Sequence, residues 1–160
     1  MFFPASSYRK ERTIAVFSRS SHSRVRVLIV DDSRTYAETL ELLLGADERI
    51  EIVGCAFDGA EGVQRALEVR PDVVVMDVQM PRLDGISATR EIRRRLRSAR
   101  VVVVTSSTTR AHRAKAFNAG ADAFLAKDTP LDELADVVAG PARNGRSPIR
   151  MKIFQASFSA

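Results

Sequence analysis

The sequence has few of the features that mark a secreted or membrane protein. Its single cysteine, Cys55, cannot form an internal disulfide, which fits a reducing cytoplasm. No stretch approaches the roughly 18 apolar residues that a membrane-spanning helix needs. The opening residues, Met1-Phe2-Phe3-Pro4, place no charged segment ahead of an apolar core, as a secretory signal would. We therefore expect a cytoplasmic protein that is not inserted in a membrane.

The net charge of +5 comes from the two ends of the chain and not from its middle. Residues 1–24 and residues 141–160 each carry a net charge of +4, whereas residues 25–140 carry −3. Residues 1–24 lack periodicity and are expected to be a disordered extension, with an organelle transit peptide as the alternative. Residues 141–160 are expected to be a linker and tail, although the alternation in 149–154 would also suit an added strand.

Between these ends, short apolar runs rich in β-branched residues alternate with amphipathic patterns. The predicted strands cover residues 25–30, 50–57, 73–77, 101–104 and 123–126. The first predicted helix begins after Ser33. The other four are predicted at Gly59 to about residue 69, at 86–96, at 109–119, and between Thr129-Pro130 and Gly140-Pro141. Alternating strands and helices predict a parallel sheet covered on both faces. With right-handed crossovers, the favoured fold is a single flavodoxin-like, doubly wound α/β domain with strand order 2-1-3-4-5.

Local signals predict how several helices begin and end. Ser33 is expected to cap the first helix, and Gly120 to cap the C-terminus of the fourth. Pro130 is expected at the first position of the last helix, where its missing N–H costs nothing. The first helix is expected to bury one face, formed by Ala37, Leu40, Leu43 and Leu44.

Polar side chains follow four of the predicted strands, namely Asp31 and Asp32, Asp77, Thr105 and Lys127. The carboxyl ends of parallel strands meet at one edge of a sheet, so these side chains should gather there. Three carboxylates within about 4–5 Å repel one another by a few kcal/mol per pair, and the cluster needs a cation. Oxygen ligands favour Mg²⁺. A carboxylate nucleophile beside Mg²⁺, a hydroxyl and a lysine has the parts for phosphoryl transfer.

Each of these residues also has a purely structural interpretation. Asp31 and Asp32 would suit a helix start, Asp77 would mark a strand's exit into a loop, Thr105 would be one of several loop hydroxyls, and Lys127 would be solvated. A single polar residue at a strand end can occur by chance, but four that converge at one edge of the sheet favour a functional site. Two further reactive residues are interpreted as structural: Cys55 as a small buried residue and His112 as a surface residue of a basic helix.

Three motifs resemble the receiver domains of bacterial two-component response regulators, of the chemotaxis-regulator kind. They are VLIVDDS at 27–33, MDVQMPRLDG at 76–85 and AGADAFLAK at 119–127, and the resemblance covers about residues 25–140. It implies that Asp77 accepts phosphate from a phosphohistidine on a sensor histidine kinase or phosphotransfer protein in a phosphorelay. Such a receiver phosphorylates and dephosphorylates itself and has no separate enzymatic output.

The same resemblance implies a role for each site residue. Asp31, Asp32, Asp77 and the backbone carbonyl of Gln79 would hold Mg²⁺, and Lys127 would pair with the phosphate.

The resemblance also implies a switch. The Thr105 hydroxyl would move toward the phosphoryl group and the Phe124 side chain would follow, although Phe124 also suits a plain core position. Gln79, Ser106 and Ser107 would tune the lifetime of the phosphate, with the small Ser106 leaving the site open.

Three functions remain open at this point. The first is a stand-alone receiver that binds its output protein through the fourth helix, fifth strand and last helix. The second is the receiver part of a helix-turn-helix transcription regulator, a class that the ending Lys127-Asp-Thr-Pro130 resembles; without an output domain, DNA binding is not expected. The third is an aspartyl-phosphate phosphohydrolase, which would need a second acid where the chain has Gln79.

Overall fold

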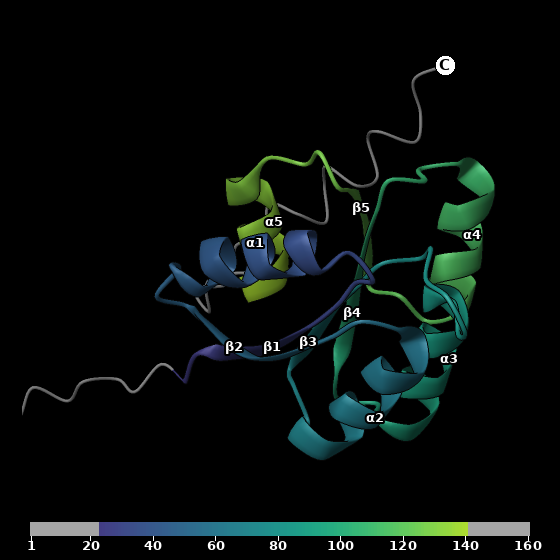
Figure 1. The fold of residues 1–160 in the computed structure, drawn as a ribbon, viewed down its shortest axis with the longest axis horizontal. Coiled ribbons are helices and arrows are strands. Elements are labelled where there is room, and N and C mark those ends of the chain that lie inside the picture. Colours follow the sequence, from purple (N-terminus) through teal and green to yellow (C-terminus); the bar gives the residue numbers. More distant parts are fainter. Residues whose placement is uncertain (1–22, 141–160) are drawn as a thin grey trace, which may run out of the picture.

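The computed structural model describes residues 23–140, and the predictions for residues 1–22 and 141–160 fall outside this range. Five strands alternate with five helices (Figure 1). In chain order they are β1 (Val25–Val30), α1 (Arg34–Gly45), β2 (Ile50–Ala56), α2 (Gly59–Val69), β3 (Val73–Met76), α3 (Gly85–Arg95), β4 (Arg100–Thr105), α4 (Arg110–Asn118), β5 (Ala123–Ala126) and α5 (Leu131–Ala139). None of these helices is long and apolar enough to cross a membrane.

The strands form one parallel sheet in the order β2-β1-β3-β4-β5, which confirms the predicted topology. Helices α1 and α5 cover one face, and α2, α3 and α4 cover the other (Figure 1). Successive side chains of a strand point to opposite faces. Val27 and Ile29 therefore pack with α1 and α5, whereas Leu28 and Val30 pack on the opposite side. Burial on both faces explains why the inner strands are continuous apolar runs.

Helix α1 begins as predicted, but one of its apolar residues faces solvent. The Ser33 side chain accepts a hydrogen bond from the Tyr36 amide at 3.3 Å and so caps the helix. Ala37, Leu40 and Leu44 are buried, whereas Leu43 is 41% exposed. The prediction for Leu43 is wrong because the helix presents only a stripe of its surface to the sheet and Leu43 lies at the margin of that stripe.

Two predicted helix ends are displaced by one residue. Ala119 is the C-cap of α4, and Gly120 follows it with φ of 103°, the left-handed conformation that glycine adopts at this position. Pro130 is the N-cap of α5 and not its first residue, and its side chain makes no capping hydrogen bond. In both cases the residue type marks the boundary correctly but lies just outside the helix.

Gly85 connects the end of β3 to the start of α3 by a very close approach. The Gly85 amide donates a hydrogen bond to the Val78 carbonyl at 2.9 Å. A Cβ atom at Gly85 would lie 1.7 Å from the backbone carbonyl oxygen of Asp77. Only a residue without a side chain allows α3 to begin directly against the loop that carries Asp77.

We predict that Gly85→Ala lowers the free energy of unfolding by about 1–3 kcal/mol, because the added methyl group displaces the backbone at Asp77. Urea denaturation monitored by circular dichroism measures the change. Gly45→Ala is the matched control, since its Cβ would make only an ordinary contact of 3.7 Å with Ile52. A loss at Gly85 no larger than that at Gly45 would show that the loop relaxes at little cost.

Candidate functional site

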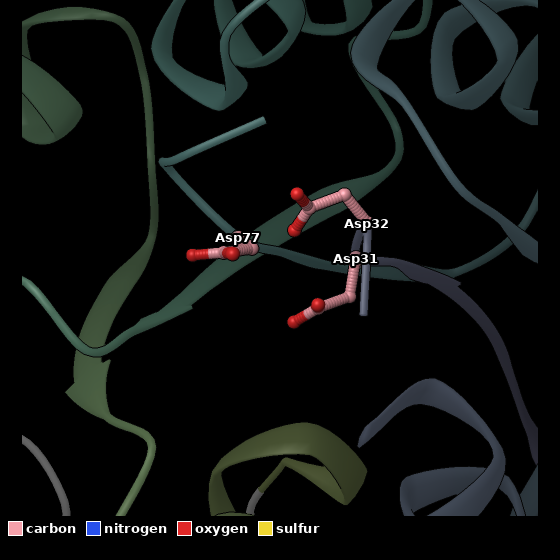
Figure 2. A group of neighbouring side chains, drawn as sticks. All are labelled: Asp31, Asp32 and Asp77. Carbon is pink, nitrogen blue, oxygen red and sulfur yellow. The ribbon is translucent and has the colours of Figure 1, made fainter. Parts of the chain in front are cut away.

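The register of the two central strands brings three carboxylates together. Val30 of β1 pairs with Met76 of β3, so the next residues in the chain, Asp31 and Asp77, leave the sheet side by side. One carboxylate oxygen from each of Asp31, Asp32 and Asp77 lies within 4.8 Å of the others. Figure 2 shows the three side chains gathered at these adjacent strand ends. Asp31 and Asp77 are buried, whereas Asp32 is exposed.

Lys127, at the end of β5, joins the two buried carboxylates. Its Nζ lies 2.6 Å from Asp31 Oδ2 and 3.2 Å from Asp77 Oδ2. The Tyr36 ring approaches the same ammonium, with its centroid 4.4 Å from Nζ. The ammonium offsets part of the negative charge that the two strand ends bring together, and this allows both carboxylates to be buried.

Hydrogen bonds fix the orientation of the two buried carboxylates. Asp77 Oδ1 accepts from the Val78 amide at 2.7 Å and from the Gln79 amide at 3.4 Å. Asp31 Oδ1 accepts from the Ser33 amide at 2.9 Å. In each residue the other oxygen, Oδ2, faces Lys127. The carboxylate planes are therefore held from both ends, as a site that aligns a reacting group requires.

Burial and charge act in opposite directions on the protonation of this cluster. Burial raises the pKa of Asp31, and the hydrogen bond from Lys127 only partly offsets it. Burial alone would lower the pKa of Lys127, but the hydrogen bond with Asp31 and the charge of Asp77 outweigh it, so that the lysine pKa rises. Lys127 consequently stays protonated at neutral pH. The Asp31 carboxylate, by contrast, is ionised at an energetic cost.

The cluster fits a hard divalent cation. Three carboxylate oxygens within 4.8 Å of one another form an oxygen-only donor set, which Mg²⁺ prefers. The exposed Asp32 leaves one side of the cluster open to water, and Mg²⁺ usually retains several waters when it binds to proteins. The arrangement agrees with the magnesium site that the sequence predicts.

Thr105 reaches the same edge of the sheet but is bonded elsewhere. It is fully buried at the end of β4, and its carbonyl accepts from the Lys127 amide at 3.1 Å. Its Oγ1 accepts from the Ser107 amide at 3.3 Å. Ser106, between them, is exposed. The hydroxyl thus lies on the strand next to Lys127, and its bond to the Ser107 amide occupies a lone pair while leaving its proton free to be donated.

His112 is not the simple surface residue that the sequence predicts. It is half-buried, and its Nδ1 lies 2.6 Å from the Ser107 hydroxyl oxygen. The pair connects the first turn of α4 to the loop that follows β4. The sequence carries no signal for this bond, because it depends on how the β4–α4 loop folds back onto its helix.

The predicted switch residue Phe124 lies away from the carboxylates. Its side chain is 4% exposed and belongs to the apolar cluster beneath α2, α3 and α4. The Arg113 guanidinium lies over the ring, 5.1 Å from its centroid, a cation–π arrangement. Gln79 is exposed, and besides its amide contact with Asp77 its side chain faces a groove between α3 and α4.

Two further contacts near the site have no signal in the sequence. Arg82, in the left-handed conformation with φ of 65°, pairs with the buried Asp58 that caps α2 and so ties the β3–α3 loop to that helix.

Cys55 is only half-buried, and its thiol lies near Glu41. Burial, with a contribution from the Glu41 charge, raises the Cys55 pKa to about 11, and the thiol is unreactive at neutral pH, as predicted.

The chain matches the model of a known protein family and is similar to known proteins. Residues 27–139 match the family model described as "Response regulator receiver domain". Transcriptional regulatory protein LiaR of Bacillus subtilis is 36% identical over 129 residues, covering 81% of this chain and 61% of LiaR. A protein-glutamate methylesterase/protein-glutamine glutaminase of Geobacter metallireducens is 42% identical over 107 residues, covering 66% of this chain and 30% of that protein. The chain therefore spans between 30% and 61% of the length of these two relatives.

Solved structures resemble the fold over most of the described residues. The receiver domain of the response regulator NarL from Mycobacterium tuberculosis superposes with a TM-score of 0.69 at 30% identity, covering 72% of this chain and 93% of that one. The response regulator domain of Thermotoga maritima CheB gives a TM-score of 0.64 at 31% identity, covering 86% of this chain and 98% of that one. These likenesses confirm the predicted fold class.

We predict that Asp31→Asn raises the free energy of unfolding at pH 7 without divalent cations, because it removes a buried charge. The folded-state pKa of Asp31 is raised, so its ionisation weakens the fold as pH rises through that pKa. The difference from wild type should therefore disappear below about pH 4, where the acid is protonated in both states. Urea titrations at several pH values measure it.

Asp128→Asn is the matched control, since it makes the same substitution at an exposed position and removes no buried charge. A lower stability of Asp31→Asn at pH 7 would mean that the Lys127 and Ser33 hydrogen bonds outweigh the cost of burying the charge.

Proposed function

Because the chain belongs to the response regulator receiver domain family of two-component systems, we propose that Asp77 accepts a phosphoryl group from a phosphohistidine on a sensor histidine kinase or phosphotransfer protein. The observation that carries the proposal is the position of Lys127, whose ammonium contacts the buried carboxylates of Asp31 and Asp77 at 2.6 and 3.2 Å. A cation held against the nucleophile can meet the charge of an incoming phosphoryl group.

In the proposed transfer, an Asp77 carboxylate oxygen attacks phosphorus and the phosphorus–nitrogen bond of the donor breaks. The electron pair of that bond returns to the imidazole nitrogen, and an aspartyl phosphate remains. Lys127 exchanges part of its contact with Asp77 for a phosphoryl oxygen. Asp31, Asp32, Asp77 and the Gln79 backbone carbonyl would hold Mg²⁺, which when bound would supply positive charge that stabilises the transferred group.

The switch that follows rests on Thr105. Its hydroxyl proton is free to bond a phosphoryl oxygen, since the Ser107 amide occupies only a lone pair. Moving Thr105 toward Asp77 would pull the β4–α4 loop with it and shift the balance between two arrangements of that loop. Phe124, two residues before Ala126 on the neighbouring strand, would repack as the loop moves. Because Thr105 and Lys127 lie on different strands and both would bond the added phosphoryl oxygens, the response would depend on phosphorylation.

We propose that residues 25–140 act as a phosphorylation-controlled binding module, with the face formed by α4, β5 and α5 as the output surface. Phe117 of α4 and Leu131 of α5 are 39% and 38% exposed and would offer apolar contacts to a partner. The 36% identity with LiaR favours the alternative, the receiver part of a DNA-binding transcription regulator. Gel shifts with phosphorylated and unphosphorylated chain across a salt series separate the two.

We predict that the wild-type chain gains the mass of one phosphoryl group when it is incubated with acetyl phosphate and Mg²⁺, and that Asp77→Asn abolishes the gain. The substitution removes the nucleophile but keeps an isosteric side chain. Intact-mass spectrometry measures the product. Asp128→Asn, the same change on an exposed neighbour of Lys127, should leave the gain intact. A wild type that gains no mass, or an Asp77→Asn chain that still does, would contradict the proposal.

We predict that Gln79→Arg and Ser107→Asn each change the half-life of the phosphorylated chain by roughly threefold or more, which is about 0.7 kcal/mol in activation free energy. Both residues lie in loops that follow site residues, and changes of charge or size there alter how water reaches the acyl phosphate. The decay of the phosphorylated mass after the donor is removed measures the half-life. Ser98→Asn, in the exposed turn after α3, is the control. Unchanged half-lives in both variants would refute a tuning role.

A further inference from the structure

The two faces of the sheet carry opposite charge. Helices α3 and α4 together contain seven Arg or Lys residues and one Glu, whereas α1 and α5 contain one Arg and five acidic residues. Helices α3 and α4 pack side by side on the same face (Figure 1). This segregation does not follow from the composition, since residues 25–140 as a whole carry a net charge of −3.

Most of the arginines of α3 are already occupied. Arg94 and Arg95 both pair with Glu91, and Arg93 donates to the backbone carbonyl of Ala99 at 2.6 Å. Arg90 of α3 and Lys115 of α4 are exposed and make no ion pair or side-chain hydrogen bond within residues 23–140. Arg97 and Arg110 are exposed as well, but Arg90 and Lys115 are the two of these cations that line the space between α3 and α4.

Arg90 and Lys115 line one groove between the two helices, with a cavity volume of about 430 Å³, within the size range of ligand sites. His112 lines it as well. The Ser107 hydroxyl lies 2.6 Å from its Nδ1, so Nε2 is the ring nitrogen left for a ligand. Apolar lining comes from Val78, Met80 and Ile86, and polar lining from Gln79, Asp84 and Ser87. Asp84 is the one acid of the lining, and its oxygens already accept hydrogen bonds that cap α3.

We propose that this α3–α4 groove is a docking site for an acidic peptide segment of a partner protein. A carboxylate of the segment would sit between Arg90, Lys115 and His112, and an apolar side chain would lie against Met80. Charge complementarity and the mixed basic and apolar lining favour this occupant. A nucleic-acid backbone needs a long row of free cations, whereas Arg94 and Arg95 of α3 share a bond to Glu91 and Arg93 is bonded to the Ala99 carbonyl.

The groove is also connected to the phosphorylation loops, a step that rests on the proposed function. Gln79 and Met80 belong to the loop after Asp77, and His112 is bonded to Ser107 in the loop after Thr105. Both loops would change when a phosphoryl group is added to Asp77. Binding of the segment and phosphorylation should therefore be coupled, because both act on the same two loops.

The test uses the full unphosphorylated chain and a short fluorescein-labelled peptide that alternates Glu with Leu and Ser. Fluorescence anisotropy should show binding that the Gln-for-Glu peptide lacks. The double variant Arg90→Gln/Lys115→Gln should weaken it roughly tenfold. The control Arg97→Gln/Arg110→Gln removes the same charge from exposed positions of the basic side outside the groove lining, and should weaken it less than about threefold.

Three results would overturn the docking proposal: no binding of the acidic peptide, equal losses in the two double variants, or tighter binding of a labelled single-stranded DNA that both variants weaken equally. Coupling is tested by repeating the titration on chain whose phosphorylation is verified by intact mass. A dissociation constant that differs by less than about threefold between the two forms would overturn the coupling. A chain that cannot be phosphorylated would instead refute the proposed function and leave the docking result standing.

Discussion

The ion contacts of Lys127 are the constraint on which the rest of the site depends. Two carboxylates, Asp31 and Asp77, are buried at adjacent strand ends where their charges repel. The Lys127 ammonium lies 2.6 and 3.2 Å from them, and it is what makes their burial tolerable. Yet the compensation is incomplete, since the pKa of Asp31 remains raised by burial. Because this negative charge is only partly compensated, the site attracts a further cation. An added anion strongly changes its electrostatic balance.

The sheet supplies the precision that this electrostatic balance requires. Parallel pairing carries Asp31, Asp77 and Lys127 to one edge from strands that are far apart in the sequence. Two contacts then fix the loop that follows Asp77. Gly85 brings α3 directly against the carbonyl of Asp77, and Arg82 ties the same loop to Asp58 at the start of α2. Rigid strands and fixed loops would hold the carboxylates and the lysine in place.

The sequence predicts the strands and the residues at their ends because both follow from local composition. Runs such as Val101–Val104, short and entirely β-branched, favour a buried strand, and parallel strands place Asp31, Asp77 and Lys127 at one edge. Contacts that depend on loop conformation are not predictable in this way. The bond between His112 and Ser107 arises from the path of one loop. Helix margins were also imprecise, since the exposure of Leu43 depends on how far α1 rotates against the sheet.

The site is linked more closely to the basic α3–α4 side of the molecule than to the acidic α1–α5 side. The acidic helices α1 and α5 lie on the same face as the contact of Tyr36 with Lys127, whereas the lining of the basic groove begins at Val78, the residue after Asp77. An added phosphoryl group changes charge within reach of both faces. On the α3–α4 side, the loop after Asp77 reaches the groove through Met80, and Ser107 in the loop after Thr105 is bonded to His112 of the groove lining. Under the proposed function, a charge change at Asp77 would reach this groove through two loops, and the groove would report phosphorylation without a rearrangement of the sheet.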